Sequence, residues 1–204
     1  MNYQVVSILP QDKKKVKICL DNGESFVLYK GEAFKLSLFE KEILEESKYQ
    51  QILTEVLGKR AIKRALYLLE RQERTEKQLR DKLQQNGYPQ VCIDLAIEYV
   101  KSYHYIDDFR YASVYIRCKQ ERESRQKLIQ KLMIKGISRE VIECAMEEEF
   151  AVDEKQQIAE LLKKRKYDAE TADEAECRRT AQFLMRRGFK AGDILSVMRY
   201  YEEY

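Results

Sequence analysis

"KLMIKGISREVIECA", residues 131–145, has two relatives within the same chain. They are "KLQQNGYPQVCIDLA" at 82–96 and "FLMRRGFKAGDILSV" at 183–197. Each copy places a glycine four residues after a leucine and an apolar residue directly after that glycine. A unit that recurs at a period of roughly fifty residues indicates a tandem array of one small structural motif.

The last part of each copy predicts an α-helix. In the first copy Ile93, Ala96, Ile97 and Val100 are spaced i, i+3, i+4 and i+7, which is the spacing of one helix face. The matching stripes are Ile142, Ala145 and Met146 in the second copy and Ile194, Val197, Met198 and Tyr201 in the third. The glycine before each stripe suits the left-handed residue that follows a helix end.

Two further helices precede each glycine. The nearer one carries apolar pairs such as Leu79 and Leu83, and Thr75 with Gln78 forms a capping-box pattern at its start. The chain is therefore predicted to be mainly α, a tandem array of three three-helix, helix-turn-helix-like repeats. The predicted repeats are 59–106, 107–151 and 152–204, with nine helices in all and with Gly87, Gly136 and Gly188 each ending a middle helix.

The N-terminal part has a different pattern. Val16, Ile18 and Leu20 alternate with polar residues, and Asn22-Gly23 predicts a type I′ hairpin turn after them. Residues 3–9 are a candidate third strand. We expect a small antiparallel β segment over 1–36, followed by a linking helix over 37–58 whose helical pattern covers about 38–57.

Composition agrees with a helical array of small cores. The 204 residues are 44% hydrophobic and 36% charged, with two prolines and seven glycines. No apolar run approaches membrane-spanning length, and the first residues do not resemble a signal peptide. Five scattered cysteines indicate reduced thiols and a cytoplasmic protein. Cys92 and Cys144 are expected to be buried or half-buried.

Several segments together resemble the RecX family of bacterial recombinase regulators. They are an Ala-x-x-x-Leu helix at 65–69, an Arg-x-x-Thr segment with spaced leucines at 71–83, a Tyr-Ile-Asp-Asp turn at 105–112, Leu-x-x-Lys-Gly-Ile at 132–137 and "RRGF" at 186–189. The resemblance covers roughly 59–201 and rests on the order and spacing of these motifs. His104 stands where the family has glycine, which we expect to loosen that turn.

The resemblance implies a regulatory protein that binds the RecA filament on single-stranded DNA. Such a protein inhibits the recombinase and ATPase activities of RecA in DNA repair and the SOS response. It implies no enzymatic activity. We expect no cofactor, and no metal because the cysteines lack ligand spacing. We expect a monomer that contacts RecA and, weakly and non-specifically, the phosphates of single-stranded DNA.

Basic charge is concentrated in two stretches although the net charge is only +3. Nine basic residues lie between 110 and 139, and the acidic stretch 140–154 follows them. Segregation of this kind favours a binding surface over a uniformly solvated one. The candidate residues for contact with a partner or DNA are Lys119, Arg122, Arg125, Lys127, Lys131, Lys135, Arg178, Arg179, Arg186 and Arg187. We expect those on the middle helices to be mostly outward-facing and unpaired.

Two other functional classes are to be weighed against this one. A non-specific DNA-binding protein of tandem helix-turn-helix-like units is the alternative, because trihelical units occur in both classes. An enzyme is disfavoured, since no phosphate loop or nucleophile–base constellation is present. Asp107 and Asp108 are interpreted as helix caps rather than metal ligands. Tyr111 and Tyr115 are expected to pack between units.

Overall fold

The computed structural model describes residues 2–200, which fall into two compact units that divide between residues 107 and 108. The first unit contains a small β-sheet, the segment that links it to the repeats, and repeat 1. The second unit contains repeats 2 and 3. The chain is mainly helical with an N-terminal antiparallel sheet, so the predicted fold class is confirmed.

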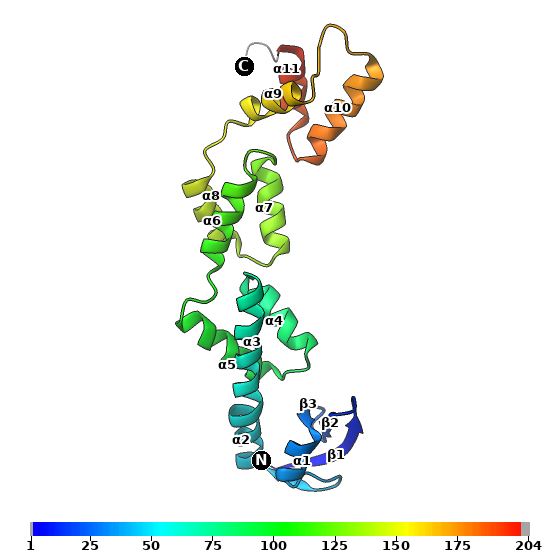
Figure 1. The fold of residues 1–204 in the computed structure, drawn as a ribbon, viewed down its shortest axis with the longest axis vertical. Coiled ribbons are helices and arrows are strands. Elements are labelled where there is room, and N and C mark those ends of the chain that lie inside the picture. The colour runs from blue at the N-terminus through cyan, green and yellow to red at the C-terminus, as the bar shows by residue number, and fades with distance from the viewer. Residues whose placement is uncertain (1, 201–204) are drawn as a thin grey trace. The chain divides into compact units, whose positions relative to one another are not determined.

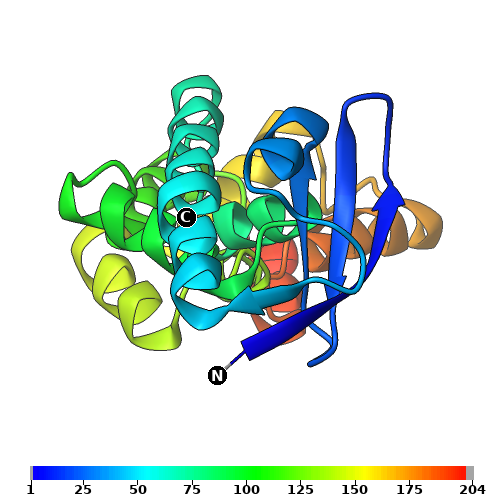
Figure 2. The ribbon, with the colours of Figure 1, turned by 90° about the horizontal axis from the view of Figure 1, so that it is seen from below.

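The sheet has four antiparallel strands in the order β3-β2-β1-β4. The strands are β1 (Asn2–Pro10), β2 (Lys15–Leu20), β3 (Ser25–Tyr29) and β4 (Ile43–Glu45), and α1 (Lys30–Lys35) follows β3. Figure 2 shows β1, β2 and β3 in blue beside α1. Val16, Ile18 and Leu20 alternate inward from β2 and are buried, as their spacing predicts.

The hairpin between β2 and β3 is real, but the predicted type I′ turn is wrong. Such a turn needs positive φ at both central residues, whereas only Gly23, with φ of 86°, is left-handed there. Asn22 instead accepts a hydrogen bond from the backbone N–H of Glu24 through its Oδ1 at 3.0 Å. This side-chain contact holds an Asx-type conformation, and the loop closes with a Leu20 N–H to Glu24 carbonyl bond of 2.9 Å.

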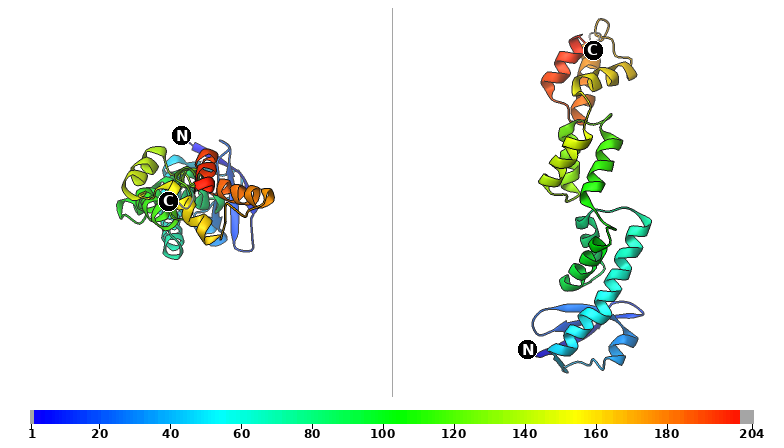
Figure 3. Two further views of the ribbon diagram at one scale, coloured as in Figure 1. Left: turned by 90° about the horizontal axis from the view of Figure 1, so that it is seen from above. Right: turned by 90° about the vertical axis from the view of Figure 1, so that its left-hand side faces the viewer.

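The predicted linking helix is wrong over its first residues. Helix begins only at α2 (Glu46–Gln51) and continues through a π-helical turn, η1 (Ile52–Gly58), into α3 (Lys59–Arg71). Figure 3 shows these three elements as one continuous cyan helix. Residues 43–45 form β4 because Leu44 pairs with Tyr3 of β1 and is fully buried. Strand pairing outweighs the local helical pattern here.

A single apolar core joins the sheet to repeat 1. Phe26 and Leu28 from β3, Leu57 from η1, and Ala65 and Ile93 from repeat 1 belong to the same buried cluster. The sequence divisions 1–36, 37–58 and 59–106 are therefore not divisions between separate cores.

Nine helices lie between residue 59 and residue 200, as predicted for the part that the structure describes. Repeat 1 consists of α3, α4 (Glu76–Gln85) and α5 (Gln90–Ser102); repeat 2 of α6 (Asp108–Lys119), α7 (Arg125–Ile134) and α8 (Arg139–Glu149); and repeat 3 of α9 (Glu154–Lys164), α10 (Glu174–Arg186) and α11 (Ala191–Tyr200). In every repeat the first helix packs against the third (Figure 1). Tyr201, which the predicted stripe of the last helix includes, lies outside the described residues.

The three middle helices end in the same way. Gly87, Gly136 and Gly188 have φ of 80°, 86° and 90°, so each takes the left-handed conformation directly after the helix. In the second repeat the N–H of Ile137 then bonds to the carbonyl of Leu132 at 3.2 Å and the N–H of Gly136 to that of Met133 at 2.9 Å. This is the Schellman arrangement, which turns the apolar residue after the glycine back onto the helix.

Within the repeats, two helices end with a left-handed residue that is not glycine. His104 follows α5 with φ of 55°, and Lys166 follows α9 with φ of 56°. The expected loosening at His104 is wrong, because the N–H of Tyr105 bonds to the carbonyl of Val100 at 2.8 Å and closes the turn. The same turn geometry is therefore reached with a backbone conformation that glycine tolerates better.

Repeats 2 and 3 have separate apolar clusters, and two predictions about side chains there are wrong. Cys144 is exposed, because it lies one residue before the buried Ala145 on α8. Tyr111 and Tyr115 stack on each other within repeat 2, with ring centroids 6.4 Å apart, rather than between units. Throughout residues 2–200, no helix combines the length and the apolar character that crossing a membrane requires.

Candidate partner-binding surface

The ten predicted basic residues lie in and around α7 and α10. Six are exposed, namely Lys119, Arg122, Arg125, Arg178, Arg179 and Arg186. The other four are half-buried, namely Lys127, Lys131, Lys135 and Arg187. All ten belong to the second unit.

The structure brings the two basic stretches together where repeat 3 meets repeat 2. The C-terminal end of α10 lies against the N-terminal end of α7 (Figure 1). The N–H of Ser124 donates to the carbonyl of Arg187 at 3.0 Å. We call the residues Arg125, Lys127, Arg186 and Arg187 at this contact the junction cations.

Gly188 makes this close contact possible. A Cβ at Gly188 would lie 2.6 Å from Ser124 Oγ and 2.7 Å from Lys127 Cβ, which is closer than real Cβ atoms approach. The glycine that ends α10 therefore has a second role, because it lets repeat 3 approach the start of α7.

A polar frame from repeat 3 holds the turn before α7. The buried side chain of Gln157 donates through Nε2 to the carbonyl of Gln120 at 2.6 Å. Glu154 accepts the N–H of Arg125 at 2.8 Å, as suits a carboxylate at a helix N-terminus. Sequence reasoning missed both residues, because contacts between a side chain and a distant backbone leave no periodic signal.

The expectation that the basic residues are unpaired is wrong for several of them. Lys131 forms an ion pair with Glu123, whose hydrogen bond raises the pKa of Lys131. Arg178 pairs with Glu174 one turn earlier on α10 at 2.8 Å. Lys135 lies over the rings of Tyr111 and Tyr115, and Arg187 lies 3.7 Å from the ring centroid of Phe183. These four cations are largely engaged inside their own repeats.

Six of the candidates remain available for a partner. Within residues 2–200, no hydrogen bond, ion pair or ring contact engages their side chains, and five of them are exposed, namely Lys119, Arg122, Arg125, Arg179 and Arg186. The sixth, Lys127, is half-buried. Arg179 and Arg186 are seven residues apart and so share one face of α10. Exposed cations without intramolecular partners can meet phosphates or acidic side chains at little desolvation cost.

The structure offers no metal site among the residues it describes. No group of three or more His, Cys, Asp and Glu side chains is placed to hold an ion there. Asp107 directly precedes α6, and Asp108 is its first residue.

Comparison with known proteins identifies the family. Three family models match in chain order: RecX, first three-helix domain, over 61–99; RecX, second three-helix domain, over 107–146; and RecX, third three-helix domain, over 153–198. The chain belongs to the RecX family. The matched spans coincide with repeats 1, 2 and 3, so every repeat of the structure has its own counterpart in the family.

Curated relatives carry the name Regulatory protein RecX. The protein of Clostridium tetani is 28% identical over 200 residues, which cover 95% of this chain and 91% of that protein. The protein of Clostridium acetobutylicum is 30% identical over 141 residues, or 68% of this chain and 66% of its own length. The protein of Clostridium botulinum strain Alaska E43 is 29% identical over 138 residues, which cover 68% of this chain and 65% of that protein.

Solved structures share the fold. A structure described as regulatory protein RecX has a TM-score of 0.59 at 22% identity and covers 99% of this chain and 100% of its own. RecX from Lactobacillus salivarius has a TM-score of 0.57 at 22% identity, over 72% of this chain and 98% of its own. Membership of this family makes the chain a regulatory protein rather than an enzyme.

Proposed function

We propose that this chain regulates the RecA recombinase by binding the RecA filament on single-stranded DNA and lowering its ATPase and strand-exchange activities. The observation that carries the proposal is the match of all three repeats to RecX domains in their family order. The role in DNA repair and the SOS response follows from the same family relation.

The junction cations and their neighbours supply a surface suited to this partner. Arg122 lies in the turn before α7, and Arg125 is the first residue of α7. Arg186 is the last residue of α10, whose end contacts this turn at Ser124. A filament on DNA presents phosphates and acidic protein side chains, both of which attract such a cluster. The polar frame of Gln157 and Glu154 fixes the start of α7 to repeat 3, and the hydrogen bond from Ser124 to the Arg187 carbonyl joins it to the end of α10.

The direct test is a titration of RecA ATPase activity on single-stranded DNA with this protein. We expect the ATPase rate to fall saturably as the protein concentration approaches that of RecA. A parallel titration at fixed protein with increasing DNA separates an effect on RecA from sequestration of DNA. An unchanged rate with a molar excess of folded protein contradicts the proposal.

For the alternative, a DNA-binding protein of tandem helix-turn-helix-like units, the last helix of each repeat offers little chemistry for reading base sequence. Base reading needs Arg, Asn or Gln at the start of a recognition helix. Here α5 starts at Gln90, which bonds to Asp94, and α8 starts at Arg139, which pairs with Glu143 at 2.7 Å. α11 starts at Ala191, which offers no polar side chain. Free DNA binding is therefore expected to be weak, indifferent to sequence and strongly reduced by salt.

A further inference from the structure

A pocket in the first unit lies between the sheet and repeat 1, and none of the ten candidate basic residues of repeats 2 and 3 lines it. Its volume is about 440 Å³, within the range of roughly 300–1,000 Å³ that small-ligand pockets occupy. The lining includes Lys15 and Tyr29, which are paired neighbours in the sheet, and the α4–α5 turn at 86–88. The rest comes mainly from α3, and no acidic residue lines the pocket in the part of the chain that the structure describes.

One face of α3 supplies most of the pocket's charge. Its pocket-lining residues are Arg60, Lys63, Arg64 and Tyr67, spaced i, i+3, i+4 and i+7. Ala61, Ala65 and Leu68 face the core from the same helix and are buried. Because the apolar face is fixed in the core, the basic face must point into the pocket and to solvent.

Three of the four cations in the pocket are not neutralised by an acid. Arg60 forms an ion pair with Glu32 and donates to the carbonyl of Val27 at 3.3 Å. Arg64 donates only its Nε, to the Oδ1 of Asn86 at 3.1 Å. Lys15 and Lys63 have no ion pair with any residue between 2 and 200. The pocket therefore carries about three uncompensated positive charges, which favours an anionic ligand.

Two tyrosine rings are presented beside these charges. Tyr29 and Tyr67 are each 41% exposed, so part of each ring is open to a ligand. The guanidinium of Arg60 lies 4.7 Å from the Tyr29 centroid, and those of Arg64 and Arg71 lie 5.2 and 4.5 Å from the Tyr67 centroid. Flat, exposed aromatic and guanidinium groups next to lysines are the combination that binds unpaired bases and their phosphates.

We propose that this pocket binds a nucleotide of single-stranded nucleic acid. Lys15, Lys63 and Arg64 hold the phosphates, and an unpaired base stacks on Tyr67. A duplex fits poorly because its bases are stacked on each other and closed to the pocket. An acidic peptide would satisfy the lysines but would make no use of the exposed parts of the two aromatic rings. The inference concerns the first unit alone and is independent of the RecA regulation proposed above.

The test is fluorescence anisotropy of a labelled oligothymidylate with the full chain and no RecA present. The double variant Lys63→Ala/Arg64→Ala should weaken binding about tenfold or more and reduce the slope of log affinity against log salt by about 1.4, since each lost phosphate contact contributes about 0.7. The control Lys13→Ala/Lys77→Ala removes two exposed cations of the same unit that do not line the pocket. Equal behaviour of the two double variants overturns the proposal.

Base stacking is tested separately at Tyr67. Tyr67→Ala should weaken oligothymidylate binding about tenfold, whereas Tyr67→Phe keeps the ring and should bind normally. Phe34→Ala removes an exposed aromatic outside the pocket and should also bind normally. Thymidine monophosphate should compete only weakly with the oligothymidylate. Any binding of polyglutamate should be the same in Tyr67→Ala as in the parent protein. Strong competition by the free nucleotide, or loss of polyglutamate binding in Tyr67→Ala, contradicts a strand site.

Discussion

Lys166 holds a backbone position that favours glycine. It follows α9 with φ of 56°, and the N–H of Tyr167 bonds back to the carbonyl of Leu162 at 3.1 Å. The corresponding position after each middle helix is glycine. A left-handed backbone conformation costs a residue with a Cβ about 1–2 kcal/mol. Glycine avoids this cost, but its unfolded chain has more conformational entropy, which offsets part of the gain.

Lys166→Gly is therefore expected to raise the free energy of unfolding by about 0.5–1 kcal/mol. Urea denaturation followed by circular dichroism measures the change. Lys166→Ala is the matched control, because it removes the same exposed side chain and keeps the Cβ. If glycine proves no more stable than alanine at this position, the strain argument fails.

Gly188 is constrained both by its own backbone and by its neighbour. Gly188→Ala places a Cβ in left-handed backbone and against Ser124 and Lys127, so we expect a loss of about 2 kcal/mol or more. Gly192→Ala is the control: it lies in α11 with nothing within 4 Å of the new methyl and should be neutral or slightly stabilising. Thermal denaturation distinguishes the two, and similar melting temperatures would contradict the contact at the repeat junction.

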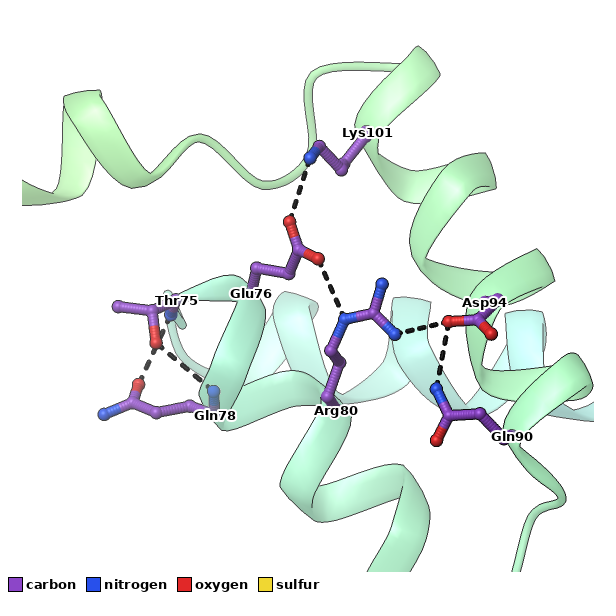
Figure 4. A network of polar contacts seen from close by, with 7 residues as sticks. All are labelled: Thr75, Glu76, Gln78, Arg80, Gln90, Asp94 and Lys101. Atoms are coloured by element: carbon purple, nitrogen blue, oxygen red, sulfur yellow. Dashed lines mark hydrogen bonds and ion pairs between the residues drawn. The ribbon is translucent and has the colours of Figure 1, made fainter. Parts of the chain in front are cut away.

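At the scale of elements, a network of charged side chains ties the helices of repeat 1 together. Figure 4 shows Glu76 at the start of α4 between Lys101 of α5 and Arg80, which also reaches Asp94 of α5. The distances are 2.9 Å from Lys101, 2.8 Å from Arg80, and 2.6 Å between Arg80 and Asp94. The capping box of Thr75 and Gln78 starts the same helix.

The network makes the stability of repeat 1 sensitive to acid. Burial by itself raises the pKa of Glu76, but hydrogen bonds from Lys101 and Arg80 outweigh it and hold that pKa below its ordinary value of 4.5. The hydrogen bond from Arg80 likewise lowers the pKa of Asp94. A carboxylate with a depressed folded pKa stabilises the fold fully above its unfolded pKa, and the stabilisation is lost as the pH falls through the folded value.

Glu76→Gln should therefore destabilise the protein by about 1 kcal/mol at pH 7, and the difference from the parent should shrink as the pH falls below about 4.5. Urea denaturation at several pH values measures both effects. Glu98→Gln neutralises an exposed carboxylate of α5 and should have little effect at any pH. A Glu76→Gln deficit that is the same at pH 3.5 and pH 7 would rule out the network as its cause.

At the scale of the whole molecule, the exposed basic residues of repeats 2 and 3 are expected to carry the effect on RecA. The change is reversal of Arg122, Arg125, Arg179 and Arg186 to Glu, a set chosen because these side chains have no partner among residues 2–200. Each exposed contact is worth about 1 kcal/mol or less, yet several together shift affinity at least about tenfold. Inhibition of the RecA ATPase should weaken accordingly while the helical circular dichroism signal stays unchanged.

The matched control reverses Lys13, Lys14, Lys17 and Lys77, four exposed cations of the first unit. This variant has the same change in net charge and should inhibit RecA more strongly than the repeat 2 and 3 variant does, at a level closer to that of the parent protein. If the control loses inhibition and the repeat 2 and 3 variant retains it, the surface that acts on RecA lies in the first unit instead.

Much of the helical array follows from the sequence alone. The apolar stripe of α5, the glycine after each middle helix and the Thr75 capping box all depend on residues within a few positions of one another. A helix satisfies its own backbone hydrogen bonds, so periodicity and end signals of this kind are sufficient to predict it. The spacing of Arg60, Lys63, Arg64 and Tyr67 also predicts the basic face of α3. Counting charges along whole stretches of sequence does not reveal this face.

Tertiary structure decided the features that join residues far apart in the chain. β4 exists because Leu44 meets Tyr3, and the polar frame exists because Gln157 meets the backbone of Gln120. The pairing of Lys131 with Glu123, which removes a predicted contact residue from the surface, depends on the turn between α6 and α7. A strand at a sheet edge, or a side chain bonded to a distant backbone group, is stabilised only by a partner that is far away in the sequence. The local sequence pattern does not identify that partner.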